Sequence, residues 1–265
     1  MSIREAAVAG SFYPGEREKL LAQLRGFFKG LAKDAGSSCV VAPHAGYIYS
    51  GKTAAYSFNA WGTADTFVIL SPNHTGLGEI ISVSDADCWE TPLGKIAVDA
   101  SLRETLLKKL GISADDLAHI QEHSIEVQLP FIQFLFPDAK ILPITLMCHD
   151  LPTLEKLGNA LYEICRGKSI GIIASSDFSH FIPEKSAKEI DARAIKLIEK
   201  LDLGGFHSLV TGRGLSICGF AAIIAAMAFC RKAGIKQGKL LKYDTSATAT
   251  GDRGNVVGYA AIKFG

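Results

Sequence analysis

Histidines follow three short apolar runs of this sequence, each run closed by turn residues. His44 follows the run at 39–43, His74 follows the run at 66–70 and its Ser-Pro-Asn turn, and His180 follows the run at 170–174. Neutral imidazole is a frequent ligand of divalent metals and also transfers protons near neutral pH. We expect His44 and His74 to project from neighbouring strand ends, where they either share a metal ion or are structural histidines. Their spacing matches no local metal motif such as His-Glu-x-x-His.

Asp177 lies three residues before His180, in Ser-Ser-Asp-Phe-Ser-His. The aspartate can orient an imidazole or bind metal, and a histidine off the metal can act as a general base. The alternative is a loop whose backbone is capped by serine and aspartate. A serine hydrolase is disfavoured, because the chain contains no Gly-x-Ser-x-Gly elbow.

Glu122 and His123 stand at the expected start of a helix, where the carboxylate complements the helix dipole or the imidazole lines a pocket. Cys218 precedes an apolar helix, and a helix amino terminus favours the thiolate form. On residue type alone, Cys218 is better explained as a small buried apolar side chain. The remaining histidines are expected to have no chemical role: His119, His149 and His207.

Apolar periodicity indicates which elements position these residues. Short β-branched runs bounded by turn residues are typical of buried strands, and three- and four-residue apolar spacing is typical of helices. Strands and helices alternate, which predicts one α/β domain over 1–265, with a mostly parallel or mixed central sheet covered by helices on both faces. We expect strands at 39–43, 66–70, 140–147, 170–174, 239–244 and 256–263, a hairpin of 80–83 with 95–98, and helices at 16–33, 50–61, 101–110, 122–136, 152–165, 184–201 and 218–233.

Composition excludes several classes of protein. The 265 residues are 48% apolar with a formal net charge of +1, so no basic footprint for nucleic acid exists. No signal peptide is visible, and the apolar stretch at 217–230 is too short to span a bilayer. We expect a cytoplasmic protein without membrane or nucleic-acid partners. None of the six cysteines forms a Cys-x-x-Cys pair, so buried thiols are expected rather than disulfides.

Six motifs in this order resemble the Memo family (mediator of cell motility), in its prokaryotic AmmeMemoRadiSam-system form. They are Ala-Gly-Ser-Phe-Tyr-Pro at 9–14, Pro-His-Ala-Gly-Tyr at 43–47, Ser-Pro-Asn-His at 71–74, Glu-His-Ser-Ile-Glu-Val-Gln-Leu-Pro at 122–130, Ser-Asp-Phe-Ser-His at 176–180 and Cys-Gly at 218–219. The resemblance runs from about residue 5 to the C-terminus. It implies the LigB-like α/β fold of class III extradiol dioxygenases.

The resemblance also implies a site. His44, His74 and Cys218 would bind a metal, with iron or copper favoured over zinc. His180 would be the acid–base histidine, with Asp177 and His123 beside it as catalytic residues. In the same motifs, Tyr47, Asn73 and Glu122 would contact a substrate. A radical SAM protein and an AMMECR-type protein would be partners.

One departure from the dioxygenases matters for function. Ring-cleaving dioxygenases hold iron with two histidines and a carboxylate, whereas Cys218 would supply a thiolate here. A similar fold therefore does not imply the same reaction. Two functions remain open: a metal-dependent redox or oxygenase-like activity, and a non-catalytic module that binds a phosphorylated or carboxylated peptide or a partner protein.

Overall fold

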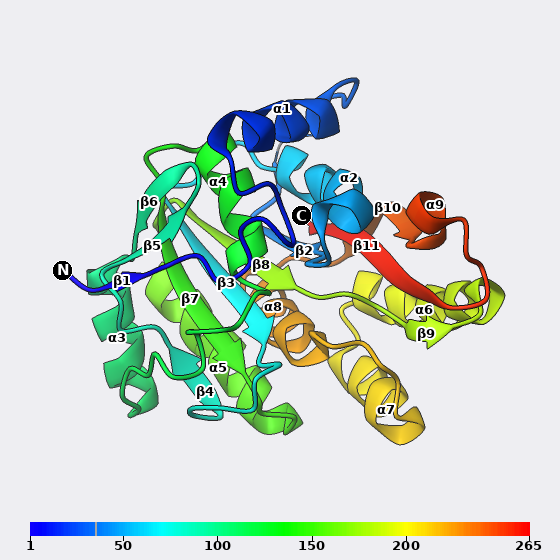
Figure 1. Cartoon of the computed structure of the whole chain (residues 1–265). Helices are drawn as coiled ribbons and strands as arrows, with labels where there is room; N and C mark the ends of the chain where they lie inside the picture. Colours follow the sequence, from blue (N-terminus) through cyan, green and yellow to red (C-terminus); the bar gives the residue numbers. More distant parts are fainter. Residues whose placement is uncertain (35) are drawn as a thin grey trace.

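The computed structural model describes residues 1–34 and 36–265 and is built on an eight-stranded mixed sheet (Figure 1). The order is β10-β11-β2-β8-β3-β7-β4, and β9 pairs with β11 off this path. The strands are β2 (Cys39–Ala42), β3 (Thr66–Pro72), β4 (Ile81–Val83), β7 (Lys140–Leu146), β8 (Ile170–Ser175), β9 (His180–Ile182), β10 (Gly238–Thr245) and β11 (Val256–Phe264).

The four central strands β2, β8, β3 and β7 are parallel, and β4, β10 and β11 add antiparallel edges. Every residue of β3 is buried, as expected for a parallel strand covered on both faces. Side chains alternate between the two faces, so Val68 and Leu70 join one apolar cluster while Phe67 and Ile69 join the other.

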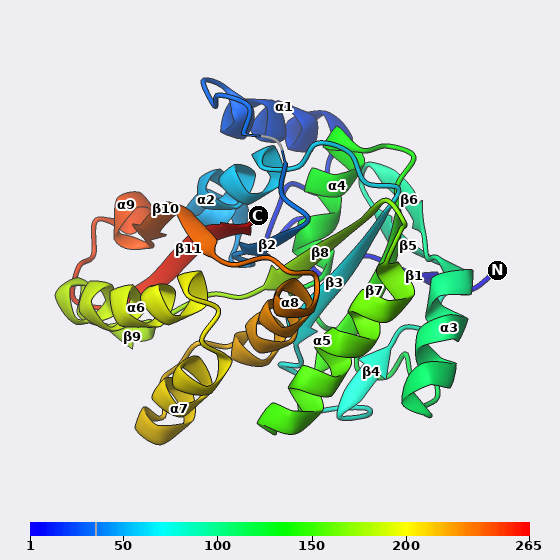
Figure 2. The same cartoon turned by 180° about the vertical axis from the view of Figure 1, so that it is seen from behind.

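Helices cover both faces of this sheet, as Figure 1 and the reverse view in Figure 2 show. One cluster unites the sheet with α3 (Ala100–Leu110), α5 (Leu151–Cys165), α6 (Glu184–Glu199), α7 (Leu203–Arg213) and α8 (Phe220–Lys232). The other unites it with α1 (Arg17–Phe28), α2 (Tyr47–Asn59) and α4 (Leu129–Leu135). A short α9 (Ala247–Thr250) follows β10. The predicted α/β class, with a mixed sheet covered on both faces, is confirmed.

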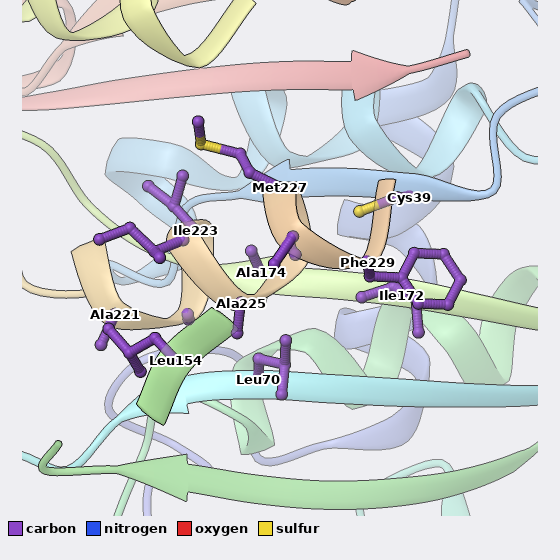
Figure 3. Close-up of a cluster of buried hydrophobic side chains, with 14 of the residues drawn as sticks. Cys39, Leu70, Leu154, Ile172, Ala174, Ala221, Ile223, Ala225, Met227 and Phe229 are labelled. Carbon is purple, nitrogen blue, oxygen red and sulfur yellow. The ribbon is translucent and has the colours of Figure 1, made fainter. Parts of the chain in front are cut away.

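Helix α8 is the central helix of its layer. All residues from Phe220 to Cys230 are buried, which confirms the predicted buried helix. Figure 3 shows α8 lying over β8 and β3, with Ile172 and Ala174 beneath it. No helix in the described part of the chain is long and apolar enough to cross a membrane.

The predicted hairpin was wrong in its pairing. The strand expected at 80–83 forms β4 and pairs with β7 of the main sheet. The true hairpin joins β5 (Cys88–Thr91) to β6 (Gly94–Ala97), and β1 (Ile3–Arg4) adds to it as a parallel third strand. Proline is usually confined to edge strands or bulges, yet Pro143 lies in β7, which is inside the sheet. The proline is tolerated there because the β4 ladder covers only Ile144 to Leu146.

The predicted helix at 122–136 begins later than expected. Residues 122–125 are irregular, a 3-10 turn spans Glu126–Gln128, and α4 follows with Pro130 in its first turn. The dipole explanation for Glu122 is therefore wrong. The other predicted helices differ from the structure mainly at their ends, and α7 was not among the predicted helices.

The N-terminal segment is tied to the molecule by Glu126, a fully buried carboxylate. Arg4 forms an ion pair with it, and the Tyr13 hydroxyl donates to its Oε1 at 2.6 Å. The amides of Ala7 and Val8 donate to the same carboxylate. Pairing and hydrogen bonds offset the high cost of burying this charge. The N-terminal segment is thus anchored to the domain through one buried carboxylate.

The contact between α5 and α8 depends on Gly158. A Cβ at this position would lie 2.3 Å from the Ala225 carbonyl oxygen and 2.6 Å from Ala228 Cβ. We expect Gly158→Ala to lower the free energy of unfolding by about 1–3 kcal/mol, because both obstacles belong to a packed helix. Gly212→Ala in α7 is the control, since its Cβ would meet no atom within 4 Å. Urea unfolding compares the two; equal stabilities would contradict a close contact at Gly158.

His119 makes the fold sensitive to acid. It is fully buried against Trp89, its Nε2 faces the Ser82 carbonyl oxygen at 3.2 Å, and burial lowers its pKa to about 4. A histidine with a depressed native pKa takes up its proton first in the unfolded state, so stability falls as the pH drops from about 6.5 to about 4.

We expect this histidine to account for a loss on the order of 2 kcal/mol between pH 7 and pH 4.5. His119→Gln keeps a donor for Ser82 but does not titrate, so the variant should lose correspondingly less stability over the same range. Urea unfolding at the two pH values measures this difference. An equal loss in both proteins would show that other groups carry the acid sensitivity.

Candidate metal centre

Three adjacent parallel strands deliver the site residues to one edge of the sheet. His44, His74 and Asp177 each lie two residues beyond the end of β2, β3 and β8, and these strands are neighbours in the order β2-β8-β3. Open α/β sheets bind ligands at this carboxyl edge. The expectation that strand ends bring these side chains together is confirmed for His44 and His74, whose ring centroids are 5.3 Å apart.

His44, His74 and Cys218 place their ligand atoms within 4.8 Å of one another. Cys218 Sγ lies 3.2 Å from His44 Nε2. His44 is buried, Cys218 is half-buried, and the His74 side chain retains 35% of its exposure. Two imidazoles and a thiol form a donor set that suits zinc, copper or iron, and the partly exposed His74 leaves one side of the set accessible.

Gly219 explains how Cys218 reaches this edge. Cys218 lies in the loop that precedes α8, and the Gly219 amide donates to Ser176 Oγ at 3.1 Å. A Cβ on Gly219 would lie 2.2 Å from the Ser175 carbonyl oxygen. Only glycine therefore allows this loop to pack directly on the end of β8.

The surroundings of Cys218 do not favour the thiolate. The cysteine precedes α8, and burial, reinforced by Asp177, raises its pKa. Activation by the helix terminus is outweighed, in line with the preference for a plain thiol on residue type alone, and a neighbouring cation is needed to stabilise the thiolate. The other five cysteines are buried and all six are free, as predicted.

Glu122 lies behind His74 and holds it from two sides. Glu122 Oε1 is 2.9 Å from His74 Nδ1, and Oε2 accepts from the His74 amide at 2.5 Å. Burial opposes ionisation of Glu122, but the hydrogen bonds and charge of His74 outweigh it and lower the pKa to about 2. Burial likewise opposes protonation of His74, and Glu122 reverses this effect and raises the pKa of His74. Glu122 thus orients His74 and leaves its Nε2 free.

His123 completes a group of three imidazoles. Its ring stacks on His74 with centroids 4.7 Å apart and meets His44 edge-on at 5.5 Å. His74, Glu122 and His123 also place ligand atoms within 4.8 Å of one another. Burial, with the positive charge of His74, lowers the pKa of His123 despite the nearby Glu122. A neutral imidazole beside the three donor atoms can accept a proton.

Asp177 supports the backbone of His44. Its Oδ1 accepts from the His44 amide at 2.8 Å, and its side chain is buried. Burial raises its pKa to about 6, although the His44 amide opposes the shift. These contacts match the alternative in which Asp177 caps the backbone of a loop. A catalytic role for Asp177 stays a prediction.

His180 opens β9 and is held by Ser216. Its amide donates to Ser216 Oγ at 2.8 Å, and its Nδ1 lies 2.7 Å from the Ser216 carbonyl oxygen. The carbonyl can only accept, so Nδ1 carries a proton, and in the neutral ring Nε2 is the nitrogen that can accept one. The expected orientation of His180 by Asp177 is thus replaced by Ser216. Phe181, with a φ of 57°, follows directly and is largely exposed.

Two predicted substrate residues have structural contacts. Tyr47 is buried among aromatic rings, and its hydroxyl donates to the Val127 carbonyl oxygen at 2.7 Å. Asn73 organises the turn beyond His74, with its Oδ1 accepting from the Thr75 and Gly76 amides. Glu122 is fully buried behind His74. Substrate contact by these three residues stays a prediction that their placement does not favour.

Phe12 was missed as a site residue. Its ring lies 4.7 Å from that of His123, and its carbonyl oxygen accepts from the Tyr47 amide at 2.7 Å. The signal was its position in a family motif, Ala-Gly-Ser-Phe-Tyr-Pro, that contained no titratable group apart from tyrosine. His149 and His207 contact Phe220 instead of the three imidazoles, and His119 contacts Trp89.

Comparison with known proteins finds relatives over nearly the whole chain. The family model described as Memo-like protein matches residues 4–263. A MEMO1 family protein of Methanosarcina mazei is 45% identical over 266 residues, covering 99% of each chain. A MEMO1 family protein of Thermococcus kodakarensis is 42% identical over 289 residues, covering 99% of each chain.

A solved structure shares the fold alone. An uncharacterised protein from Escherichia coli K12 superposes with a TM-score of 0.61 at 10% identity, covering 86% of this chain and 100% of that one. This match supports the α/β architecture and says nothing of activity. The family match and the near-complete relatives identify the chain: it belongs to the Memo family.

Proposed function

We propose that this protein binds a redox-active metal ion, iron or copper in preference to zinc, through His44, His74 and Cys218, and uses it in redox or oxygenase-like chemistry. One observation carries the proposal: three ligand atoms from three separate segments lie within 4.8 Å of one another at the carboxyl edge of the sheet. Two of those segments are strand ends, and the third is placed there by Gly219.

The state of the ligands fits a cation. Burial, with the charges of His123 and His74, lowers the pKa of His44, which favours the neutral imidazole that a metal requires. Burial raises the pKa of Cys218, so its thiol is expected to ionise only when a positive charge lies beside it. Glu122 accepts the Nδ1 proton of His74, as a carboxylate commonly does behind a metal-binding histidine.

A bound metal would supply electron transfer or Lewis-acid polarisation of a substrate oxygen. The protein's own groups would handle protons. His123 is stacked on His74 and has a lowered pKa, and the neutral form of His180 would accept a proton at Nε2 because its Nδ1 donates to the Ser216 carbonyl oxygen. We assign both as proton acceptors, with His180 as the primary one.

The thiol supports redox chemistry over ring cleavage by the dioxygenase route. Thiolate is softer than carboxylate, and it favours Cu(I), zinc or a redox-active iron. Zinc would instead suit a structural or hydrolytic role. The LigB-like comparison is thus proposed for the fold and not for the substrate.

A binding module is the second candidate. Large exposed apolar side chains occur in segments next to the site residues: Ile48 and Tyr49 after His44, Leu77 and Ile80 after His74, and Phe181 after His180. Exposed apolar surface beside a site is typical of protein or peptide contacts. Such a module would take a phosphorylated or carboxylated peptide or a partner protein, with a radical SAM protein and an AMMECR-type protein as candidate partners.

The metal proposal is tested by elemental analysis of protein purified anaerobically without a histidine tag. We expect near-stoichiometric iron or copper in the wild type and its loss in His44→Ala and Cys218→Ala, because each removes one of three ligands. Cys148→Ala and His207→Ala are matched controls that should keep the metal. A wild type that stays metal-free after reconstitution would refute the proposal and favour the binding module. Stoichiometric zinc would refute its redox part.

The proton role of His180 is tested by oxygen uptake with reconstituted iron and a catechol. We expect His180→Ala to retain its metal and lose about 10²–10⁴ in rate, the usual contribution of a general acid–base group. His207→Ala provides the control. Equal oxygen uptake by His180→Ala and wild type would remove His180 from the mechanism.

A further inference from the structure

Ser175 contacts His44 from the side opposite to Cys218. Its Oγ is 2.9 Å from His44 Nδ1, whereas Cys218 Sγ is 3.2 Å from His44 Nε2. Ser175 is the last residue of β8 and is fully buried. The two nitrogens of this imidazole therefore face different partners, and the position of one proton decides which nitrogen can bind a metal.

The hydrogen-bond partners of Ser175 determine which nitrogen of His44 carries the proton. The Ser175 hydroxyl lies 2.7 Å from the Ser124 carbonyl oxygen, which can only accept. It lies 2.8 Å from Gln128 Nε2, which can only donate. A hydroxyl has one proton and two lone pairs. The Ser175 hydroxyl donates its proton to the Ser124 carbonyl oxygen, and one of its lone pairs accepts from Gln128 Nε2. The remaining lone pair must therefore accept the Nδ1 proton of His44.

Gln128 has its amide orientation fixed in turn. Its Nε2 also donates to the Pro43 carbonyl oxygen at 2.9 Å, so turning the amide over would place two oxygens against each other. In this orientation its Oε1 is buried without a hydrogen-bond partner. An unpaired buried acceptor costs about 1–3 kcal/mol. A side chain kept at such a cost is typical of a functional site.

We propose that Ser175, set by Gln128 and Ser124, is the positioning residue that keeps the proton of His44 on Nδ1 and leaves Nε2 as the ligand atom. The inference rests on the proposed metal site. It makes the two histidine ligands unequal, because Glu122 fixes His74 with a charged carboxylate and Ser175 fixes His44 with a neutral hydroxyl. Both histidines are thus oriented toward the proposed metal site, and no second carboxylate is needed beside His44.

The direct test is ¹⁵N NMR of histidine-labelled protein treated with a chelator, which reports the protonated nitrogen without any metal. The His44 signals are assigned by their absence from His44→Gln. We expect wild type to show a protonated Nδ1 and an unprotonated Nε2. Ser175→Ala should show both tautomers, because Nδ1 loses its acceptor. Gln128→Met should shift the balance in the same direction, because the hydroxyl becomes free to donate to His44.

A second readout is zinc affinity, measured by competition with a chromophoric chelator. We expect Ser175→Ala to bind zinc about 10–100-fold more weakly, the usual loss on removing a partner of a metal-binding histidine. Thr145→Val is the matched control, since Thr145 is a buried β7 residue whose Oγ1 has no partner. It should keep the wild-type tautomer and affinity.

The inference is overturned if wild-type His44 carries its proton on Nε2, or if both Ser175→Ala and Gln128→Met keep the wild-type tautomer. Should Ser175→Ala fail to fold, Gln128→Met alone decides, because it replaces the amide by a side chain of similar size. Wild type that shows the expected tautomer but no affinity for zinc, copper or iron would refute the proposed metal function while leaving the proton assignment intact.

Discussion

The buried polar segment Glu122–Gln128 is the constraint on which the rest of the site depends. Every second residue of this segment is polar and fully buried, and each is bonded to a distant part of the chain. Glu122 forms hydrogen bonds with His74, and the Ser124 carbonyl oxygen accepts one from Ser175. Glu126 accepts hydrogen bonds from the N-terminal segment, and Gln128 donates to Pro43 and Ser175. Buried polar groups are costly unless paired, so these bonds fix the strand ends relative to one another.

The charges of the segment are balanced locally. Arg4 neutralises Glu126, and His74 pairs with Glu122, whose charge raises the pKa of that imidazole. His44 has no such partner, and burial with its neighbours keeps it neutral. A metal bound at His74 would take over the cationic role beside Glu122. The same arrangement therefore accepts either a proton or a metal ion at this edge of the sheet.

Close packing of α8 places Cys218, the third proposed ligand, at the site. Gly158 allows α5 to approach α8, and Gly219 allows the loop before α8 to lie on β8. Figure 3 shows small side chains, Ala225 of α8 and Ala174 of β8, between helix and sheet. Cys218 owes its place beside His44 to this packing, since no strand carries it to the site.

The sequence by itself determined the strands, because buried runs at 66–70 and 170–174 are short, β-branched and closed by turn residues. It thereby determined that His44 and His74 share an edge, and the order of motifs indicated the family and Cys218 as a candidate ligand. Apolar alternation cannot reveal strand partners, so the pairing of Ile81–Val83 with β7 was missed. Hydrogen-bond partners are likewise set by distant segments. Only the tertiary structure decided that Glu122 is the hydrogen-bond partner of His74 and that Ser216 is the partner of His180. It also decided that Ser175, oriented by Gln128, is the partner of His44.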